Sequence, residues 1–194
     1  MKKILIIQGH PNASNEHFCD AIAEKYTESA MQAGFSVSQV NVAELNFPLL
    51  ESQKDFDRSS TNPDIMELQK KILWADHLVI IYPLWLGGMP ALLKGVLEQV
   101  LRPGFAFEIE GVQPIPQKLL KGKSARLFVT MGMPGLFYRW YYRAHTVKSL
   151  KRNILQFCGI KPVRYSCFGR LSQNKQKLGQ RYLVQVSRLA ELGK

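Results

Sequence analysis

Short apolar runs alternate with segments of helical pattern along this chain, and this alternation is what most constrains its fold. We expect strands at residues 3–8, 35–42, 76–82, 125–131 and 161–168. Helices are expected at residues 15–33, 63–75, 90–101, 143–158 and 172–192, and loops at 43–62 and 102–122. Strands that alternate with helices form parallel sheets. The predicted fold class is therefore α/β, a doubly wound five-stranded parallel sheet with helices on both faces.

The chain shows no internal repeat and no linker, so we expect one domain over residues 1–194. No apolar run approaches the ~18–20 residues that a membrane span needs. The apolar stretch at the N-terminus is too short for a signal peptide and no cleavage site follows it. The 3 cysteines are widely spaced, which is typical of a reducing compartment. These features together predict a cytoplasmic protein.

The formal net charge of +11 is unevenly distributed along the chain. Residues 1–101 hold 8 basic and 12 acidic side chains, whereas residues 102–194 hold 18 and 3. A basic half attracts nucleic acid, anionic lipid, an acidic partner protein or a phosphorylated cofactor, or is simply solvated surface. The chain has no zinc-finger spacing, no basic arm and no aromatic box of the RRM type. Nucleic acid is therefore the less favoured partner.

Residues 78–95 indicate a buried strand, a tight apolar loop and the start of a helix. Pro83 ends the strand because it has no N–H for the ladder, and Gly87 and Gly88 allow a close turn. The loop is uncharged, contains Trp85 and Leu86, and lies where open α/β sheets bind ligands. A planar, apolar, polycyclic ligand suits such a loop, and a loop packed under the core is about equally compatible with its composition.

Two further loops are expected at the same edge of the sheet. Residues 9–18 lead into a helix, whose N-terminal amides favour phosphate, with Ser14, Asn15 and His17 as further donors. Capping of the helix by Ser14 or Asn15 explains those two residues equally well. Residues 130–135 contain glycines that permit close approach, and Thr130 can donate a hydrogen bond. One phosphate loop and two flat loops describe a flavin pocket.

Several other kinds of site are excluded by motif and spacing. The chain has no G-x-G-x-x-G after the first strand, no complete P-loop, no G-x-S-x-G and no H-E-x-x-H. The 4 histidines show no ligand spacing, so no metal site is expected.

The three loops resemble those of the flavodoxin-like NAD(P)H:quinone oxidoreductases, DT-diaphorase-like proteins, in their bacterial branch. The resemblance rests on residues 9–11, 83–95, 103–107 and 157–159, and it covers nearly the whole chain. It implies a bound FAD, or FMN in some members, and two-electron transfer from NAD(P)H to a quinone-like acceptor. It also implies a homodimer. Some bacterial relatives are regulatory subunits of potassium-efflux systems, so a flavoprotein docking on a membrane transporter is the alternative.

The resemblance also implies roles for individual residues. The expected catalytic residues are Tyr138 and His145, and His145 lies one position from the family's catalytic histidine. Phe107 and Ile109 replace two family tyrosines of the acceptor pocket. The expected cofactor-binding residues are His10, Asn15, His17, Phe18, Pro83, Leu84, Trp85, Leu86, Gly87, Thr130, Met131 and Gly132.

FAD is favoured over FMN because a basic half can hold a second phosphate. Arg164, Arg170 and Lys175, which we expect to follow the last strand, are the candidates. We further predict that Trp85 forms one wall of the flavin pocket, because it follows a strand in a loop with two glycines and no charge.

Overall fold

The computed structural model describes residues 1–14, 17–109, 116–170 and 176–194. Its main sheet has strands β1 (Lys3–Gln8), β2 (Ser36–Asn41), β3 (His77–Pro83), β6 (Ser124–Thr130) and β7 (Val163–Phe168). They lie in the order β2-β1-β3-β6-β7, and every neighbouring pair is parallel. This is the flavodoxin-like strand order, with its switch point between β1 and β3. The predicted doubly wound five-stranded sheet is confirmed.

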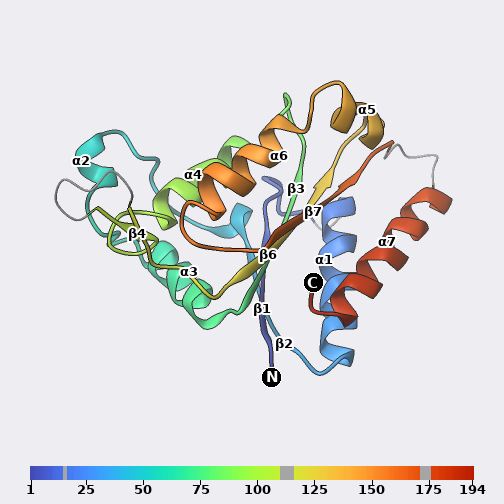
Figure 1. Ribbon diagram of the computed structural model, residues 1–194, viewed down its shortest axis with the longest axis horizontal. Helices are drawn as coiled ribbons and strands as arrows, with labels where there is room; N and C mark the ends of the chain where they lie inside the picture. Colours follow the sequence, from blue (N-terminus) through green and yellow to red (C-terminus); the bar gives the residue numbers. More distant parts are fainter. Residues whose placement is uncertain (15–16, 110–115, 171–175) are drawn as a thin grey trace.

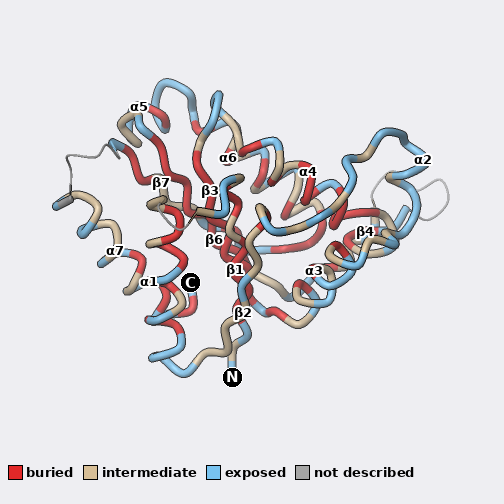
Figure 2. The backbone as a smooth tube through the Cα atoms, turned by 180° about the vertical axis from the view of Figure 1, so that it is seen from behind, coloured by how far each residue is buried: buried red, intermediate tan, exposed pale blue. Residues whose placement is uncertain are grey.

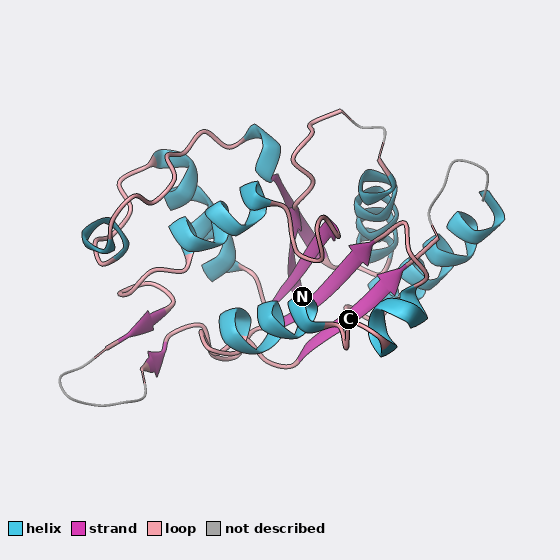
Figure 3. Ribbon diagram, turned by 90° about the horizontal axis from the view of Figure 1, so that it is seen from above, coloured by secondary structure: helices cyan, strands magenta, loops and turns pink. Residues whose placement is uncertain are grey.

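Helices cover both faces of the sheet (Figures 1 and 3). Helices α1 (Phe18–Gln32) and α7 (Gln176–Glu191) lie side by side on one face. Helices α3 (Pro63–Trp74), α4 (Ala91–Val100) and α6 (His145–Ser149) lie on the other. A π-helical segment, Leu150–Leu155, continues α6. No helix among the described ranges is long and apolar enough to cross a membrane.

The apolar runs form two cores because successive side chains of a strand point to opposite faces. Ile4 and Ile6 of β1 pack toward α1 and α7, whereas Leu5 and Ile7 pack toward α3 and α4. All of β3 is buried, as Figure 2 shows for the centre of the molecule, so its sequence is apolar without alternation. The hydrophobic pattern thus places β1 and β3 in the middle of the sheet and their carboxyl ends at one edge.

The regions expected to be loops contain several short elements. Residues 43–62 include most of a 3₁₀ turn (Val42–Glu44) and the short helix α2 (Gln53–Phe56). Residues 102–122 include the antiparallel pair β4 (Phe107–Glu108) and β5 (Gln117–Lys118). The short helix α5 (Gly135–Trp140) follows β6 and was not expected. These elements have too few residues to show a period.

Candidate functional site

A cavity of about 310 Å³ lies at the carboxyl ends of β1, β3 and β6. Three loops meet there, and all but one of the lining residues were expected to bind the cofactor. The lining consists of His10, His17, Phe18, Cys19, Pro83, Leu84, Trp85, Thr130, Met131 and Gly132. Cys19 is the one lining residue that was not predicted from the sequence. The only sequence feature that could have indicated it is its position directly after Phe18. The topology therefore brings together loops that are far apart in the sequence.

The first loop holds two stacked imidazole rings. The centroids of His10 and His17 are 3.7 Å apart with an interplanar angle of 24°. Nδ1 of His10 lies 3.2 Å from the backbone nitrogen of Asn12 and 3.3 Å from its carbonyl oxygen, so the backbone of Asn12 fixes the orientation of the ring. Ser14 Oγ lies 3.2 Å from His17 Nε2. Burial, and secondarily the neighbouring His17, lowers the pKa of His10. Two imidazoles and a hydroxyl thus gather before helix α1.

Helix α1 starts at Phe18, three residues later than expected, with His17 as its N-cap. The backbone N–H of His17 donates to Asp20 Oδ2 at 2.7 Å, and the side chain of Gln8 donates to the other oxygen of Asp20. This carboxylate satisfies an amide that would otherwise be free at the helix start. Neither Ser14 nor Asn15 is the N-cap, and Asn15 lies outside the described residues. The Ser14 hydroxyl instead contacts the His17 ring at 3.2 Å.

The second loop reverses direction within a two-residue turn. Trp85 and Gly88 exchange backbone hydrogen bonds of 2.9 and 2.8 Å, and Leu86 and Gly87 have φ values of 45° and 78°. Both central residues are left-handed, as in the I′ turns of hairpins. Trp85 stays at the cavity, edge-on to His10 with centroids 5.7 Å apart. The turn carries Leu86 and Gly87 to an exposed tip, and neither residue lines this cavity, so their cofactor-binding role stays a prediction.

The third loop closes the cavity from β6. The Leu84 N–H donates to the Thr130 carbonyl at 2.8 Å, which ties the second loop to the third. Thr130 Oγ1 lies 3.4 Å from Cys19 Sγ. Burial raises the pKa of the Cys19 thiol to about 11, so Cys19 lines the cavity as a neutral thiol. A Cβ added at Gly132 would meet no heavy atom within 4 Å, which leaves the backbone there open to a ligand.

The two expected catalytic residues lie outside the cavity lining. Tyr138 of α5 is 2% exposed, and its hydroxyl lies 2.6 Å from Thr146 Oγ1. Burial raises the pKa of Tyr138. His145 is exposed at the start of α6, after two left-handed residues, Arg143 and Ala144. Thr146 contacts the Tyr138 hydroxyl and orients it, but it was not predicted from the sequence. Its position beside His145 is the only sequence feature that could have indicated it.

The basic candidates for a second phosphate are separated by the fold. Arg164 is the second residue of β7 and pairs in register with Arg126, so it lies at the end of the strand remote from the cavity. Its expected position after the strand is wrong. Arg170 does follow β7, and its N–H donates to the Met133 carbonyl at 3.1 Å beside the third loop. Lys175 lies outside the described residues.

The two residues that replace family tyrosines differ in how far they are buried. Phe107 is buried, and its ring packs against that of Phe157 with centroids 4.9 Å apart. Ile109 is 61% exposed. Phe107 therefore belongs to the core under β4, and Ile109 remains available at the surface.

Comparison with known proteins gives consistent results. The sequence profile of a family described as having a flavodoxin-like fold matches residues 2–188. An uncharacterized NAD(P)H oxidoreductase from Haemophilus influenzae is 32% identical over 169 residues, 85% of this chain and 82% of that protein. The ribosyldihydronicotinamide dehydrogenase (quinone) of Pongo abelii is 29% identical over 185 residues, 82% of this chain and 78% of that protein.

A solved structure shows the same fold. It is an FMN-dependent NADH-azoreductase from Bacillus anthracis in complex with FMN. The similarity covers 99% of this chain and 99% of that one, with a TM-score of 0.75 and 20% sequence identity.

Proposed function

Because the chain belongs to the family with the flavodoxin-like fold, we propose that it is a flavin-dependent NAD(P)H oxidoreductase that reduces quinones or similar acceptors. The observation that carries this proposal is the meeting of three predicted cofactor loops around one cavity at the switch point of the sheet. The names of the two relatives, an NAD(P)H oxidoreductase and a quinone-dependent dehydrogenase, support the reaction class.

The residues of the cavity fit a flavin in their chemistry. His10 and His17 of the lining, with Ser14 in contact with the His17 ring, supply nitrogen and hydroxyl groups for a phosphate ahead of α1. Trp85 offers an aromatic wall, half-exposed and therefore accessible. Gly132 leaves room for a ring to approach the backbone. The described ranges hold no group of three metal-ligating side chains, so metal chemistry is not part of the proposal.

A bound flavin would accept a hydride from NAD(P)H and deliver two electrons to the acceptor. The chain's own contribution is to bind, orient and supply protons. Burial raises the pKa of Tyr138, so this hydroxyl stays protonated and can donate a hydrogen bond. Thr146 holds the hydroxyl in place at 2.6 Å. We propose Tyr138 as the donor near the flavin edge and keep His145, next to Thr146, as the second catalytic candidate.

The surroundings of the cavity bear on the choice between FAD and FMN. Arg164 no longer supports FAD, because it lies at the remote end of β7. Arg170 remains beside the third loop as a group for a second phosphate. The Bacillus anthracis azoreductase binds FMN. We propose FAD with FMN as the alternative, and chromatography of the flavin released by heat distinguishes them.

The partners follow from the family resemblance. A homodimer stays a prediction, which sedimentation equilibrium of the flavin-loaded protein tests. The cytoplasmic location likewise stays a prediction. Neither relative compared above is named as a transporter subunit, so the regulatory alternative is not favoured.

The proposed function is tested by purifying the protein and recording its absorbance and its turnover. We expect a flavin spectrum and oxidation of NADPH that depends on an added benzoquinone. A colourless protein that stays free of flavin after incubation with FAD and with FMN contradicts the proposal.

A further inference from the structure

Helix α5 and the turn after it carry large apolar side chains into solvent. We call Leu136, Phe137, Trp140, Tyr141 and Tyr142 the α5 aromatic patch. Trp140 is 81% exposed, Leu136 79% and Tyr141 62%. Figure 1 shows α5 at the outer edge of the molecule, and Figure 2 shows exposed backbone there. Contiguous exposed apolar groups of this size mark an interaction surface.

The patch is ordered by its own ring contacts. Phe137 stacks on Tyr141 with centroids 5.1 Å apart and an interplanar angle of 6°. Tyr142 meets Tyr141 edge-on at 5.0 Å. Tyr138 turns inward from the same helix and is buried. The helix therefore has a buried inner face and an exposed outer face. Because the outer rings already pack on one another, binding a partner would restrict their side chains little further.

The patch is linked to the cavity through Thr146. The hydroxyl of Tyr138 contacts Thr146 of α6 at 2.6 Å. A Cβ added at Gly88 would lie 4.0 Å from Thr146 Cγ2, so the 85–88 turn packs on the same residue. Leu86, at the tip of that turn, is fully exposed. The exposed turn and α5 thus stand on either side of one residue.

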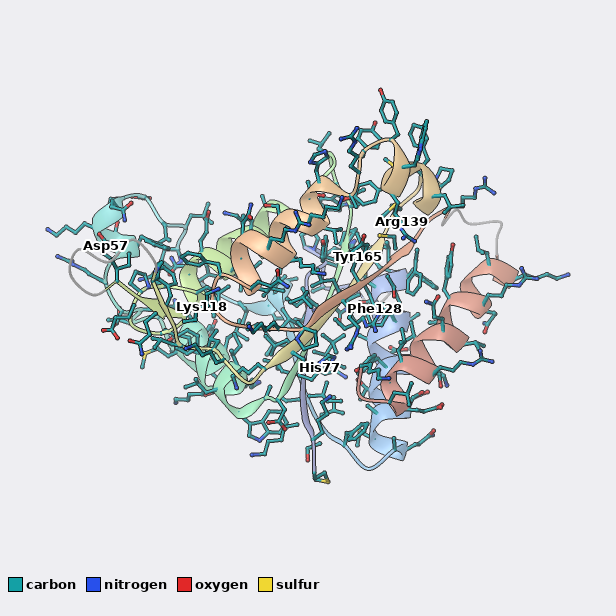
Figure 4. All side chains as sticks on the ribbon, viewed as in Figure 1. Asp57, His77, Lys118, Phe128, Arg139 and Tyr165 are labelled. Carbon is teal, nitrogen blue, oxygen red and sulfur yellow. The ribbon has the colours of Figure 1, made fainter. Side chains whose placement is uncertain are left out.

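The sequence segment that holds the patch carries charge of one sign. Residues 111–190 hold 16 Lys and Arg and no Asp or Glu. Arg139 and Arg143 alternate with the aromatic residues and are exposed, and Figure 4 places Arg139 on α5. Trp and Tyr rings favour the headgroup level of a bilayer, and Arg is attracted by anionic lipid. This combination is typical of a surface that binds a membrane without crossing it.

We propose that the α5 aromatic patch docks this protein on an anionic lipid bilayer. The apolar rings enter the headgroup region, and Arg139 and Arg143 meet lipid phosphates at its surface. A second copy that met this patch with its own copy of the patch fits less well. Such a two-fold contact would bring two cationic surfaces together, and the segment supplies no carboxylate to neutralise them.

Docking would change which quinone the protein reduces most readily. This second step rests on the proposed function, whereas docking itself does not. With the patch in the headgroup region, the 85–88 turn, which lies close to Thr146, is brought near the membrane, and Trp85 of that turn lines the cavity. A long-chain quinone dissolved in the bilayer would then reach the site more readily than one that must cross water. Loss of docking should slow reduction of the membrane-dissolved quinone and leave that of a water-soluble benzoquinone unchanged.

The test is co-sedimentation of the full chain with vesicles. One set contains equal parts phosphatidylglycerol and phosphatidylcholine, and the other contains phosphatidylcholine alone. We expect binding to the anionic set that weakens as salt is raised. The double variant Leu136→Ser/Trp140→Ser should bind about 10-fold more weakly. The control Met31→Ser/Leu73→Ser removes similarly exposed apolar side chains from α1 and α3 and should bind like the wild type.

The charge is tested by a second matched pair. Arg139→Gln/Arg143→Gln should weaken binding about 10-fold, whereas Arg181→Gln/Arg188→Gln on α7 should have a much smaller effect. The docking proposal is overturned if the wild type does not sediment with anionic vesicles, or if the α7 variant loses binding as much as the α5 variant. It is also overturned if the patch variants turn a dimer into a monomer, because a second copy would then be the occupant. Circular dichroism of each variant checks that it is folded.

Discussion

Gly132 and Gly169 both lie near the third loop, but their surroundings differ. A Cβ at Gly169 would lie 2.4 Å from the Gly135 nitrogen and 2.4 Å from the Met133 carbonyl oxygen, both backbone atoms. We expect Gly169→Ala to cost about 1–3 kcal/mol of unfolding free energy, because backbone must move. At Gly132 a Cβ meets nothing within 4 Å. Gly132→Ala should therefore change stability by less than about 0.5 kcal/mol.

The same Gly132→Ala variant should retain flavin more weakly, because its methyl group occupies space that the ring needs. Urea unfolding of the flavin-free proteins and fluorescence titration with flavin measure the two effects. Equal flavin affinity in Gly132→Ala and the wild type would exclude close approach at this backbone.

Trp85 is half-exposed and touches His10 edge-on, so it is a wall of the cavity rather than part of the core. Trp85→Gly should cost much less than the ~3–5 kcal/mol of a buried aromatic truncation. Flavin affinity should fall about 10-fold, since an aromatic contact contributes ~0.5–1.5 kcal/mol beyond its buried area. Thermal unfolding without flavin and equilibrium dialysis check this, with Trp140→Ser as the control outside the cavity. A large fall in melting temperature with unchanged flavin affinity would refute the assignment.

At the scale of elements, α5 and α6 are joined through the hydrogen bond between Tyr138 and Thr146. Tyr138→Phe and Thr146→Val each remove it and should each cost about 1 kcal/mol of stability. Only Tyr138→Phe removes the proposed donor, so hydride transfer from NADPH should slow about 10-fold or more in that variant. Thr146→Val leaves the hydroxyl present but no longer held, so its rate should fall less. Stopped-flow bleaching of the flavin absorbance measures the rate.

The pH profile separates a chemical from a structural role of Tyr138. Burial raises the pKa of Tyr138, so its hydroxyl stays protonated up to its ordinary value of about 10 and beyond. No loss of rate below that pH should come from this group. Equal rates in the Tyr138→Phe and Thr146→Val variants would leave Tyr138 a purely structural residue.

At the scale of the whole molecule, one buried histidine should govern acid stability. His77 of β3 is 1% exposed, and its Nδ1 lies 2.8 Å from Ser124 Oγ (Figure 4 labels His77). Its Nε2 has no hydrogen-bond partner in the part of the chain that the structure describes. Burial first, and then the charges of Lys2, Arg126 and Arg164, lowers the pKa of His77 to about 3.

A histidine with a lowered pKa is neutral in the folded state, whereas the unfolded chain binds a proton below about pH 6.5. Its contribution to stability is present above that pH and is lost as the pH falls toward 3. The loss is about 1.4 kcal/mol for each unit of pKa difference. Urea unfolding from pH 7 to pH 4 should show a steeper decline for the wild type than for His77→Leu. The exposed His145→Gln variant is the control and should follow the wild type, and parallel curves for His77→Leu would contradict the assignment.

The sheet was predictable because both faces of its central strands are buried. The expected strand at 76–82 is β3, and Pro83 ends it as predicted. The start of α1 was predicted too early, because the bond from His17 to Asp20, with Gln8 beside it, decides where the helix begins. Helix α5 has six residues, and its outer face is as apolar as its inner one. No amphipathic period could reveal it.

Most of the cavity lining could be predicted because parallel strands bring their following loops to one edge. Leu86 and Gly87 were assigned to the lining from a motif, but the tight turn carries them outward. Cys19 lines the cavity and contacts Thr130, whereas Thr146 lies outside the lining and contacts Tyr138. Those contacts span different elements, and no local pattern contains them.

The sequence alone determined the fold class, the succession of the five main strands and the long helices along the chain, and the edge of the sheet at which the three predicted loops meet. Burial of apolar side chains at a fixed period is a local property that can be read along the chain. Only the tertiary structure decided that His10 stacks on His17, that Tyr138 is held by Thr146, and that the aromatic residues beside Arg139 face solvent. Exposure and ring contact depend on which other segments occupy the neighbouring space, and that is settled only when all elements pack together.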